Sequence, residues 1–408
     1  MSTTVKRRSE LDLMGMLVVL GLVFFHTGQI FYSSGFYVVN EPPSMAALVF
    51  VAFASVWGMP LMFLISGITV WYSLSKRTTV EFIRNRIRRL LIPFVTGLLL
   101  VVPPQVYYGL KADPAYHKSY LHFYPRFFDV QFALEFPLFI KGVPPDEFFR
   151  LSTLYFLIDL FVLTLLLLPA FQYLQTSSGK QRVERWANFL TRSGAIYTLA
   201  LPIGITEAIL GSGFEGNWNP AAWMLFIFYG FLFTCDRRFG RALQKQWKTT
   251  IILGVIAFVF WFVGVGMLSS GYQIDPFTDY DLTSVLVRFL RSFTGWFLVV
   301  AIMGLATRKP RSKLTQTQND VPLQESEDAH EPGLMDRIAA YAKEAQLPFY
   351  IIHQLPIVVI GFYVVQWEAS ATIKYMAICL FTIIVTLALY DIGVRRTRVT
   401  RFLFGVKE

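Results

Sequence analysis

The feature that most constrains this chain is a succession of apolar runs, most of them long enough to cross a membrane. About twenty apolar residues span a bilayer as a helix, and a helix satisfies its own backbone hydrogen bonds there. We therefore predict an all-α, polytopic transmembrane helical bundle with about ten spans, forming one domain over residues 1–408. The predicted spans are residues 11–32, 45–74, 90–110, 151–174, 194–210, 221–235, 250–268, 283–306, 347–367 and 371–393.

Composition agrees with this class. Hydrophobic residues make up 54% of the chain and charged residues only 16%, against roughly 25% charged residues in soluble proteins. The net charge of +10 would suggest a nucleic-acid partner in a soluble chain. Here the lysines and arginines gather between apolar runs, so the predicted partner is the lipid bilayer and no nucleic acid is expected.

The basic clusters occupy every second connection. Loops rich in Lys and Arg remain in the cytoplasm, so an even number of spans places both termini there, in a multi-pass protein of the cell (inner) membrane. The clusters are residues 6–8, 76–89, 180–192, 237–248, 308–313 and 395–401.

Two connections are unusually long. Residues 111–150, on the predicted outer side, are rich in proline and aromatic residues, which favours a partly folded loop lying against the membrane. Residues 307–346, on the predicted cytoplasmic side, contain a polar stretch over 308–331 with the composition of disordered chain. We therefore expect the second loop to be partly disordered.

His26 lies inside the first apolar run, LDLMGMLVVLGLVFFHTGQIFY. An ionisable side chain at membrane depth is costly and indicates a functional site by default. A neutral imidazole titrates near physiological pH and is suited to be a general base. Two interpretations stand side by side: a catalytic base, or a structural histidine satisfied by one hydrogen bond to a neighbouring helix.

The alternation of span directions places further charged residues at a similar depth. Asp159, Glu207, Arg288 and Arg291 all fall in the outer half of the membrane, where they should face one another or a watery cavity. Two structural alternatives remain for the arginines: they snorkel to the outer headgroups, or the two carboxylates neutralise them. His353, near the start of the ninth predicted span, falls instead toward the inside.

Several segments resemble the acyltransferase-3 superfamily, integral membrane acyltransferases that modify glycans and other exported molecules. They are LDLMGMLVVLGLVFFH ending at His26, GMPLMFLISG (58–67), FIRNRIRRLLIPF (82–94), LYFLIDL (154–160), RSFTGWFLVVAIMGL (291–305) and LPFYIIHQLPIVV (347–359). The pattern is closest to the branch containing glucan-biosynthesis protein C, associated with succinylation of periplasmic glucans. The chain departs from the family at Gly15, where an arginine is usual and Arg8 is a candidate substitute, and at Thr153, where a histidine is frequent.

The resemblance implies a membrane O-acyltransferase that moves an acyl group from cytoplasmic acyl-CoA, a co-substrate and not a bound cofactor, to a hydroxyl of an exported glycan or similar envelope molecule. Such a transfer needs a base and donors for the developing oxyanion. We expect His26 to be the base, with Asp159 or Glu207 orienting it or balancing its charge. Arg288 and Arg291, three residues apart, could grip a carboxylate such as that of a succinyl group.

The remaining candidate residues have weaker signals. His353 matches the late histidine of the family, and we assign it to substrate binding. Ser66 is placed with it, although Ser66 and Gly67 fit close helix packing better than a nucleophile.

A basic loop is the candidate binding site for coenzyme A. Its arginines could bind the coenzyme's phosphates, or equally serve topology and lipid contact. They are Arg84, Arg86, Arg88 and Arg89. No metal-ligand spacing is present in the sequence. The alternative function is a multi-span transporter or flippase that passes a polar or glycan substrate through the cavity that the charged residues of the outer half would face.

Overall fold

The computed structural model describes residues 9–32, 35–213, 217–269, 275–307 and 333–406. These residues are mostly helical. Six of the helices are long and apolar enough to cross a membrane, and two bent pairs of helices raise the number to eight if each pair is one span. Two shorter apolar helices accompany them.

The helices are α1 (Ser9–Tyr32), α2 (Met45–Leu74), α3 (Thr79–Arg86), α4 (Ile92–Leu100), α5 (Val102–Lys111), α6 (Tyr120–Arg126), α7 (Tyr155–Leu166), α8 (Leu168–Gln175), α9 (Ser177–Leu190), α10 (Ala200–Leu210), α11 (Pro220–Cys235), α12 (Arg237–Met267), α13 (Leu282–Ala306), α14 (Leu334–Ile352), α15 (Gln354–Val364), α16 (Ala371–Leu389) and α17 (Arg398–Leu403). The strands are β1 (Val130–Phe132) and β2 (Ile140–Gly142). Short 3-10 and π turns are η1 (Ile87–Leu91), η2 (Ser152–Leu154), η3 (Ala195–Leu199) and η6 (Tyr390–Val394).

Every predicted span is largely helical, but not every one is a straight crossing. The predicted spans 151–174 and 347–367 are the two bent pairs, with bends of 50° and 56°. The predicted spans 194–210 and 221–235 are the two shorter helices. The structure therefore supports six to eight spans by length and composition, and ten remains a prediction.

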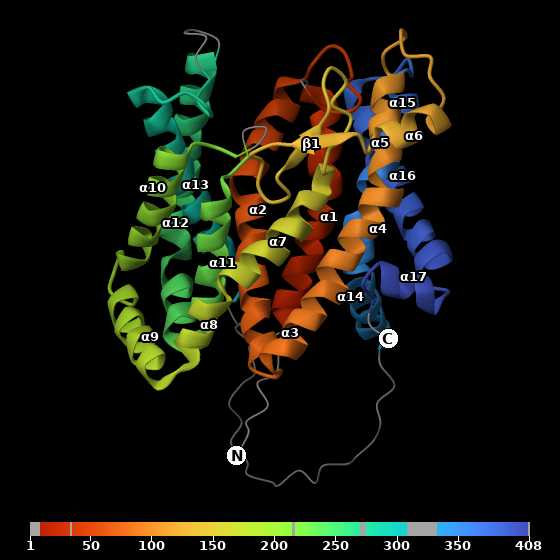
Figure 1. Ribbon diagram of the computed structural model, residues 1–408. Coiled ribbons are helices and arrows are strands. Elements are labelled where there is room, and N and C mark those ends of the chain that lie inside the picture. The colour runs from red at the N-terminus through yellow and green to blue at the C-terminus, as the bar shows by residue number, and fades with distance from the viewer. Residues whose placement is uncertain (1–8, 33–34, 214–216, 270–274, 308–332, 407–408) are drawn as a thin grey trace.

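Helix α2 stands at the centre of the bundle and packs against α1, α11 and α13. Figure 1 shows α3, α9 and α17 toward one end of the bundle, and α6 with β1 at the other. Helices α3, α9 and α17 carry three of the predicted basic clusters. The basic residues of separate loops thus gather at one end, which is the arrangement that the predicted topology requires.

The two long connections differ. Residues 111–150 fold into α6 and an antiparallel β-hairpin in which Val130 pairs with Gly142, and the rings of Phe123 and Phe127 are fully buried beneath them. The disorder predicted for 308–331 falls outside the described residues. Helix α14 begins at Leu334, inside the predicted cytoplasmic loop.

Candidate active site

A cavity of about 2240 Å³ lies between α1, α2, α12 and α13 and extends under the connections that precede α7 and α11. Small-molecule sites usually measure about 300–1,000 Å³, so there is room here for more than a small acyl group. Its walls divide into two parts of different chemistry. The polar arm contains His26, Gln29, Thr153, Asp159, Asn217 and Gln354. The apolar arm contains Leu17, Trp57, Ile251, Trp261, Leu298 and Ile302.

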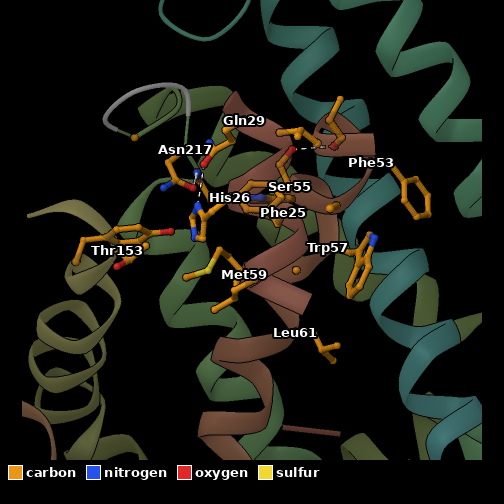
Figure 2. A pocket seen from close by; sticks show the side chains of 18 of the residues that line it. Phe25, His26, Gln29, Phe53, Ser55, Trp57, Met59, Leu61, Thr153 and Asn217 are labelled. Atoms are coloured by element: carbon orange, nitrogen blue, oxygen red, sulfur yellow. Dashed lines mark hydrogen bonds between the residues drawn. The ribbon is translucent and has the colours of Figure 1, made fainter. Parts of the chain in front are cut away.

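His26 faces the polar arm from α1 (Figure 2). Its Nδ1 lies 2.7 Å from Oε1 of Gln29, three residues later on the same helix face. A carboxamide oxygen only accepts hydrogen bonds, so in this arrangement Nδ1 carries the proton and Nε2 keeps a lone pair. The ring is therefore oriented as a general base requires. Its orienting partner is Gln29. From the sequence we had expected Asp159 or Glu207 in this role.

His353 lies directly beside His26. The centroids of the two rings are 5.4 Å apart, although the sequence placed His353 nearer the inner side. The expected separation is wrong because α14 begins at Leu334 and not at the predicted residue 347. At 1.5 Å per residue His353 therefore lies about 29 Å along this helix, and α14 and α15 bend by 56° only at His353 itself. The His353 ring is fully buried and its Nδ1 lies 2.7 Å from the carbonyl oxygen of Tyr350.

The polar arm gathers hydrogen-bonding groups that have no partner within the described part of the chain. Buried polar atoms normally have at least one partner, so such a concentration indicates a place for a polar ligand. The unpartnered atoms of the arm are Thr153 Oγ1, Asp159 Oδ1 and Gln354 Oε1. A further one, His353 Nε2, belongs to a residue that is next to His26 but does not line the cavity. The backbone carbonyl of Thr153 accepts a hydrogen bond from the Tyr350 hydroxyl, which fixes the start of α7 against α14.

Glu207 and Arg291 form a buried ion pair behind the cavity wall. Glu207 also accepts hydrogen bonds from the backbone and side chain of Asn219, at 2.9 and 2.7 Å, and Arg291 donates to the Ser212 hydroxyl at 2.9 Å. Ser212 and Asn219 themselves line the cavity. The pair thus holds the connection between α10 and α11 in place, and the neutralising interpretation of Glu207 fits this geometry.

Arg288 is also internal. Its guanidinium donates to the carbonyl oxygens of Glu207, Pro276 and Asp279, at 2.7 to 3.1 Å, and lies over the ring of Tyr280. The exposed fractions of Arg288 and Arg291 are 0% and 4%. The snorkelling interpretation is therefore wrong for both arginines.

Ser66 lies away from the cavity. Its hydroxyl donates to the Met62 carbonyl at 2.8 Å within α2. A Cβ added at the adjacent Gly67 would collide with the backbone of Ile227 on α11. The segment is thus a site of close helix contact, which agrees with the packing interpretation.

The basic loop forms a second, smaller cavity of about 300 Å³. Arg84, Arg88 and Arg89 line it together with Glu81 and Phe402. The fourth predicted arginine, Arg86, is absent from this wall and places its guanidinium 5.0 Å from the ring centre of Phe82.

Gly15 shows how the chain accommodates its departure from the expected arginine. A Cβ at this position would lie 2.8 Å from Nε2 of Gln346 on α14. An arginine would therefore have to displace the Gln346 side chain, and α14 packs closely on α1 instead. Arg8, the candidate substitute, lies outside the described residues.

Sequence reasoning missed three polar residues of the site: Gln29, Tyr350 and Gln354. Gln29 could have been found, because its spacing of three residues from His26 places both side chains on one helix face. Gln354 follows His353 directly. Tyr350 and His353 are also three residues apart, but the contact of Tyr350 with Thr153 depends on packing between helices distant in the sequence.

Comparison with known proteins gives one match. A family model described as an acyltransferase domain, of the acyltransferase-3 type, matches residues 8–391, which is nearly the whole chain. No curated protein and no solved structure matches the chain.

Proposed function

Because the chain belongs to the acyltransferase-3 family and is therefore a multi-pass membrane acyltransferase, we propose that it moves an acyl group from cytoplasmic acyl-CoA to a hydroxyl of an exported glycan or similar envelope molecule. The observation that carries this proposal is His26 on the wall of the polar arm, with its Nδ1 in a hydrogen bond and a second imidazole, that of His353, directly beside it. The match to an acyltransferase favours this function over transport.

In this proposal Nε2 of His26 accepts the proton of the acceptor hydroxyl as its oxygen attacks the thioester carbonyl carbon. The new C–O bond forms, the C–S bond breaks, and the proton passes to the departing coenzyme A thiolate. His353 is buried beside His26 and outside the cavity lining, so in this proposal it positions the His26 ring and not the substrate that the sequence had assigned to it. The imidazolium formed during the reaction is balanced by Asp159, the carboxylate in the same arm.

The developing oxyanion needs hydrogen-bond donors at the cavity wall. Thr153 is suited to this role because its hydroxyl is buried and its Oγ1 has no partner among the described residues. Figure 2 shows Thr153 and Asn217 near His26 on the same side of the site.

The proposed donor enters from the basic end of the bundle, which we assign to the cytoplasm of the inner membrane. Arg84, Arg88 and Arg89 would bind the phosphates of coenzyme A there. Alanine at Arg84 and Arg89 should raise the KM for acetyl-CoA more than it lowers kcat, because this site holds the donor far from the reacting atoms.

The proposed function is tested by mass spectrometry of envelope glycans from cells with and without the gene. We expect an acyl mass on one hydroxyl-bearing component that disappears with the gene and returns with the wild-type protein. Identical glycan masses, together with gene-dependent uptake of a labelled oligosaccharide into vesicles, would favour a transporter instead.

A further inference from the structure

The apolar arm is not needed to hold an acetyl or succinyl group. From Leu13 to His26 the cavity follows α1 for about 20 Å, at 1.5 Å per residue. This length matches a long hydrocarbon chain. Every charged residue that lines the cavity lies at or above the polar arm: Glu135, Lys141, Arg150 and Asp159.

The arm opens sideways, in the middle of long apolar helices. Leu17 on α1 is 59% exposed and Val255 on α12 is 46% exposed, and both line the cavity. A ligand could therefore enter from the bilayer without passing through water. The phosphates of coenzyme A would be excluded from such a surface by the cost of leaving water.

Two residues of the apolar arm, Trp57 and Trp261, carry a buried indole N–H without a hydrogen-bond partner among the described residues. Trp261 on α12 is 4% exposed, lines the cavity, and its Nε1 has no hydrogen-bond partner among the described residues. An indole N–H in an apolar wall normally finds a partner when it is buried. An oxygen near one end of a lipid chain would provide one.

The two arms meet between α1 and α2 at a pair of glycines. Gly28 on α1 packs against Val51 on α2, and the helices run antiparallel, because Ser44 N–H donates to the Phe31 carbonyl at their joined ends. Gly21 precedes Gly28 on α1, and Gly58 follows Val51 on α2, in each case by about two helical turns. The two glycines therefore lie at the same level of the bundle. Both line the cavity, and a Cβ at either would meet nothing within 4 Å.

The space left free of side chains at these two glycines is called here the Gly21/Gly58 window. Figure 2 shows His26 and Thr153 on one side of the central helices, with Phe53 and Trp57 on the other, toward α12. A molecule with its chain in the apolar arm could reach His26 with its polar end through this window.

We propose that the apolar arm binds the hydrocarbon chain of a lipid-linked acceptor, whose hydroxyl-bearing end passes the Gly21/Gly58 window to reach His26. The proposal rests on the proposed acyltransferase function and adds the class of its acceptor. A lipid-linked acceptor accounts for the lateral opening, the uncharged walls and the connection to the base.

The test uses the full-length protein in detergent micelles and hexadecanol carrying a photoreactive diazirine and an alkyne in its chain. After illumination, cross-linked peptides are located by mass spectrometry. We expect labelling on residues 13–21 of α1 and 251–265 of α12. Gly58→Leu and Gly21→Leu each fill the window. Each should lower the labelling of these two segments roughly tenfold.

Gly393→Leu is the matched control. Gly393 also has open space around it but lies outside the cavity, so labelling should be unchanged. Gly58→Ala, a smaller change at the window, should lower labelling less than Gly58→Leu. Size-exclusion profiles equal to wild type show that the variants are folded.

Equal labelling of the wild-type and Gly58→Leu proteins would overturn the proposal, as would labelling spread evenly over the exposed face of α16. A second probe, the CoA thioester of hexadecanoic acid with the same diazirine, separates the donor's chain from the acceptor's. Labelling of the arm by the thioester and not by the alcohol would also overturn it. The labelling experiment does not depend on acyl transfer. If labelling is as expected but the glycan masses do not change with the gene, the proposed function fails and the proposed lipid site in the apolar arm stands.

Discussion

At the residue scale, Gln29 determines which nitrogen of His26 can act as a base. Its carboxamide oxygen holds the proton on Nδ1 and leaves Nε2 to the cavity. The carbonyl of Tyr350 does the same for Nδ1 of His353. Two imidazoles, each with its Nδ1 in a hydrogen bond, thus lie side by side, and His26 is the one that faces the cavity.

The buried pair of Arg291 and Glu207 makes a prediction at this scale. Arg291→Gln leaves Glu207 buried without its counter-charge, which costs about 3–5 kcal/mol of stability. Denaturation in detergent micelles measures the change. The double variant Arg291→Gln, Glu207→Gln should recover a large part of the loss, because it removes the isolated charge. A single variant as stable as wild type would show that the pair contributes nothing to the fold.

At the element scale, the contact between α2 and α11 depends on glycines. Gly67 lies against the backbone of Ile227, whereas Gly58 on the same helix has open space around it. Gly67→Ala should therefore lower the thermal transition, because α11 must move away. Gly58→Ala, the matched control on α2, should leave the free energy of unfolding within about 0.5 kcal/mol of wild type. Equal effects of the two substitutions would contradict the packing.

The start of α13 gives a prediction with a pH dependence. Asp281 caps this helix, and hydrogen bonds from the Ser284 side chain and then the Ser284 and Thr283 backbone lower the pKa of its carboxyl. A lowered folded-state pKa means that the charged form stabilises the protein at neutral pH, and that this contribution is lost as pH falls through that pKa. The thermal transition of Asp281→Asn should lie below wild type at pH 7 and approach it in acid. A difference that is independent of pH would contradict this.

The elements also show what could be predicted from the sequence. Hydropathy is a local property, so the positions of the apolar helices, and the place of His26 within the first of them, could be read directly. The contact of His353 with His26 depends on the early start of α14 at Leu334 and on the packing of α14 and α15 against α1, and it joins residues from the two ends of the chain. The pairing of Glu207 with Arg291 was one of the alternatives. The role of Gln29 was missed because polar residues without charge carry little signal in an apolar run.

At the scale of the whole molecule, the gathering of basic loops at one end predicts sidedness. In a protein with Cys235 and Cys379 replaced by alanine, a cysteine at Ser177, at the start of α9, should react with an impermeant maleimide only after permeabilisation. Cysteines at Ser119 and Thr278 should react in intact cells. Labelling of Ser119 only after permeabilisation would overturn the assigned orientation.

The most direct test concerns His26 as the general base for acyl transfer to a hydroxyl-bearing envelope molecule. With the proposed orientation, inverted membrane vesicles from expressing cells present the basic end to the medium, so radiolabelled acetyl-CoA added outside reaches the proposed donor site. Wild-type vesicles should incorporate label into an extractable hydroxyl-bearing acceptor, and so should His122→Gln, whose histidine lies on α6 away from the cavity. His26→Gln should lower incorporation about 10²–10⁴-fold, because glutamine restores a hydrogen bond but not the base. Incorporation by His26→Gln at the wild-type rate would contradict the account.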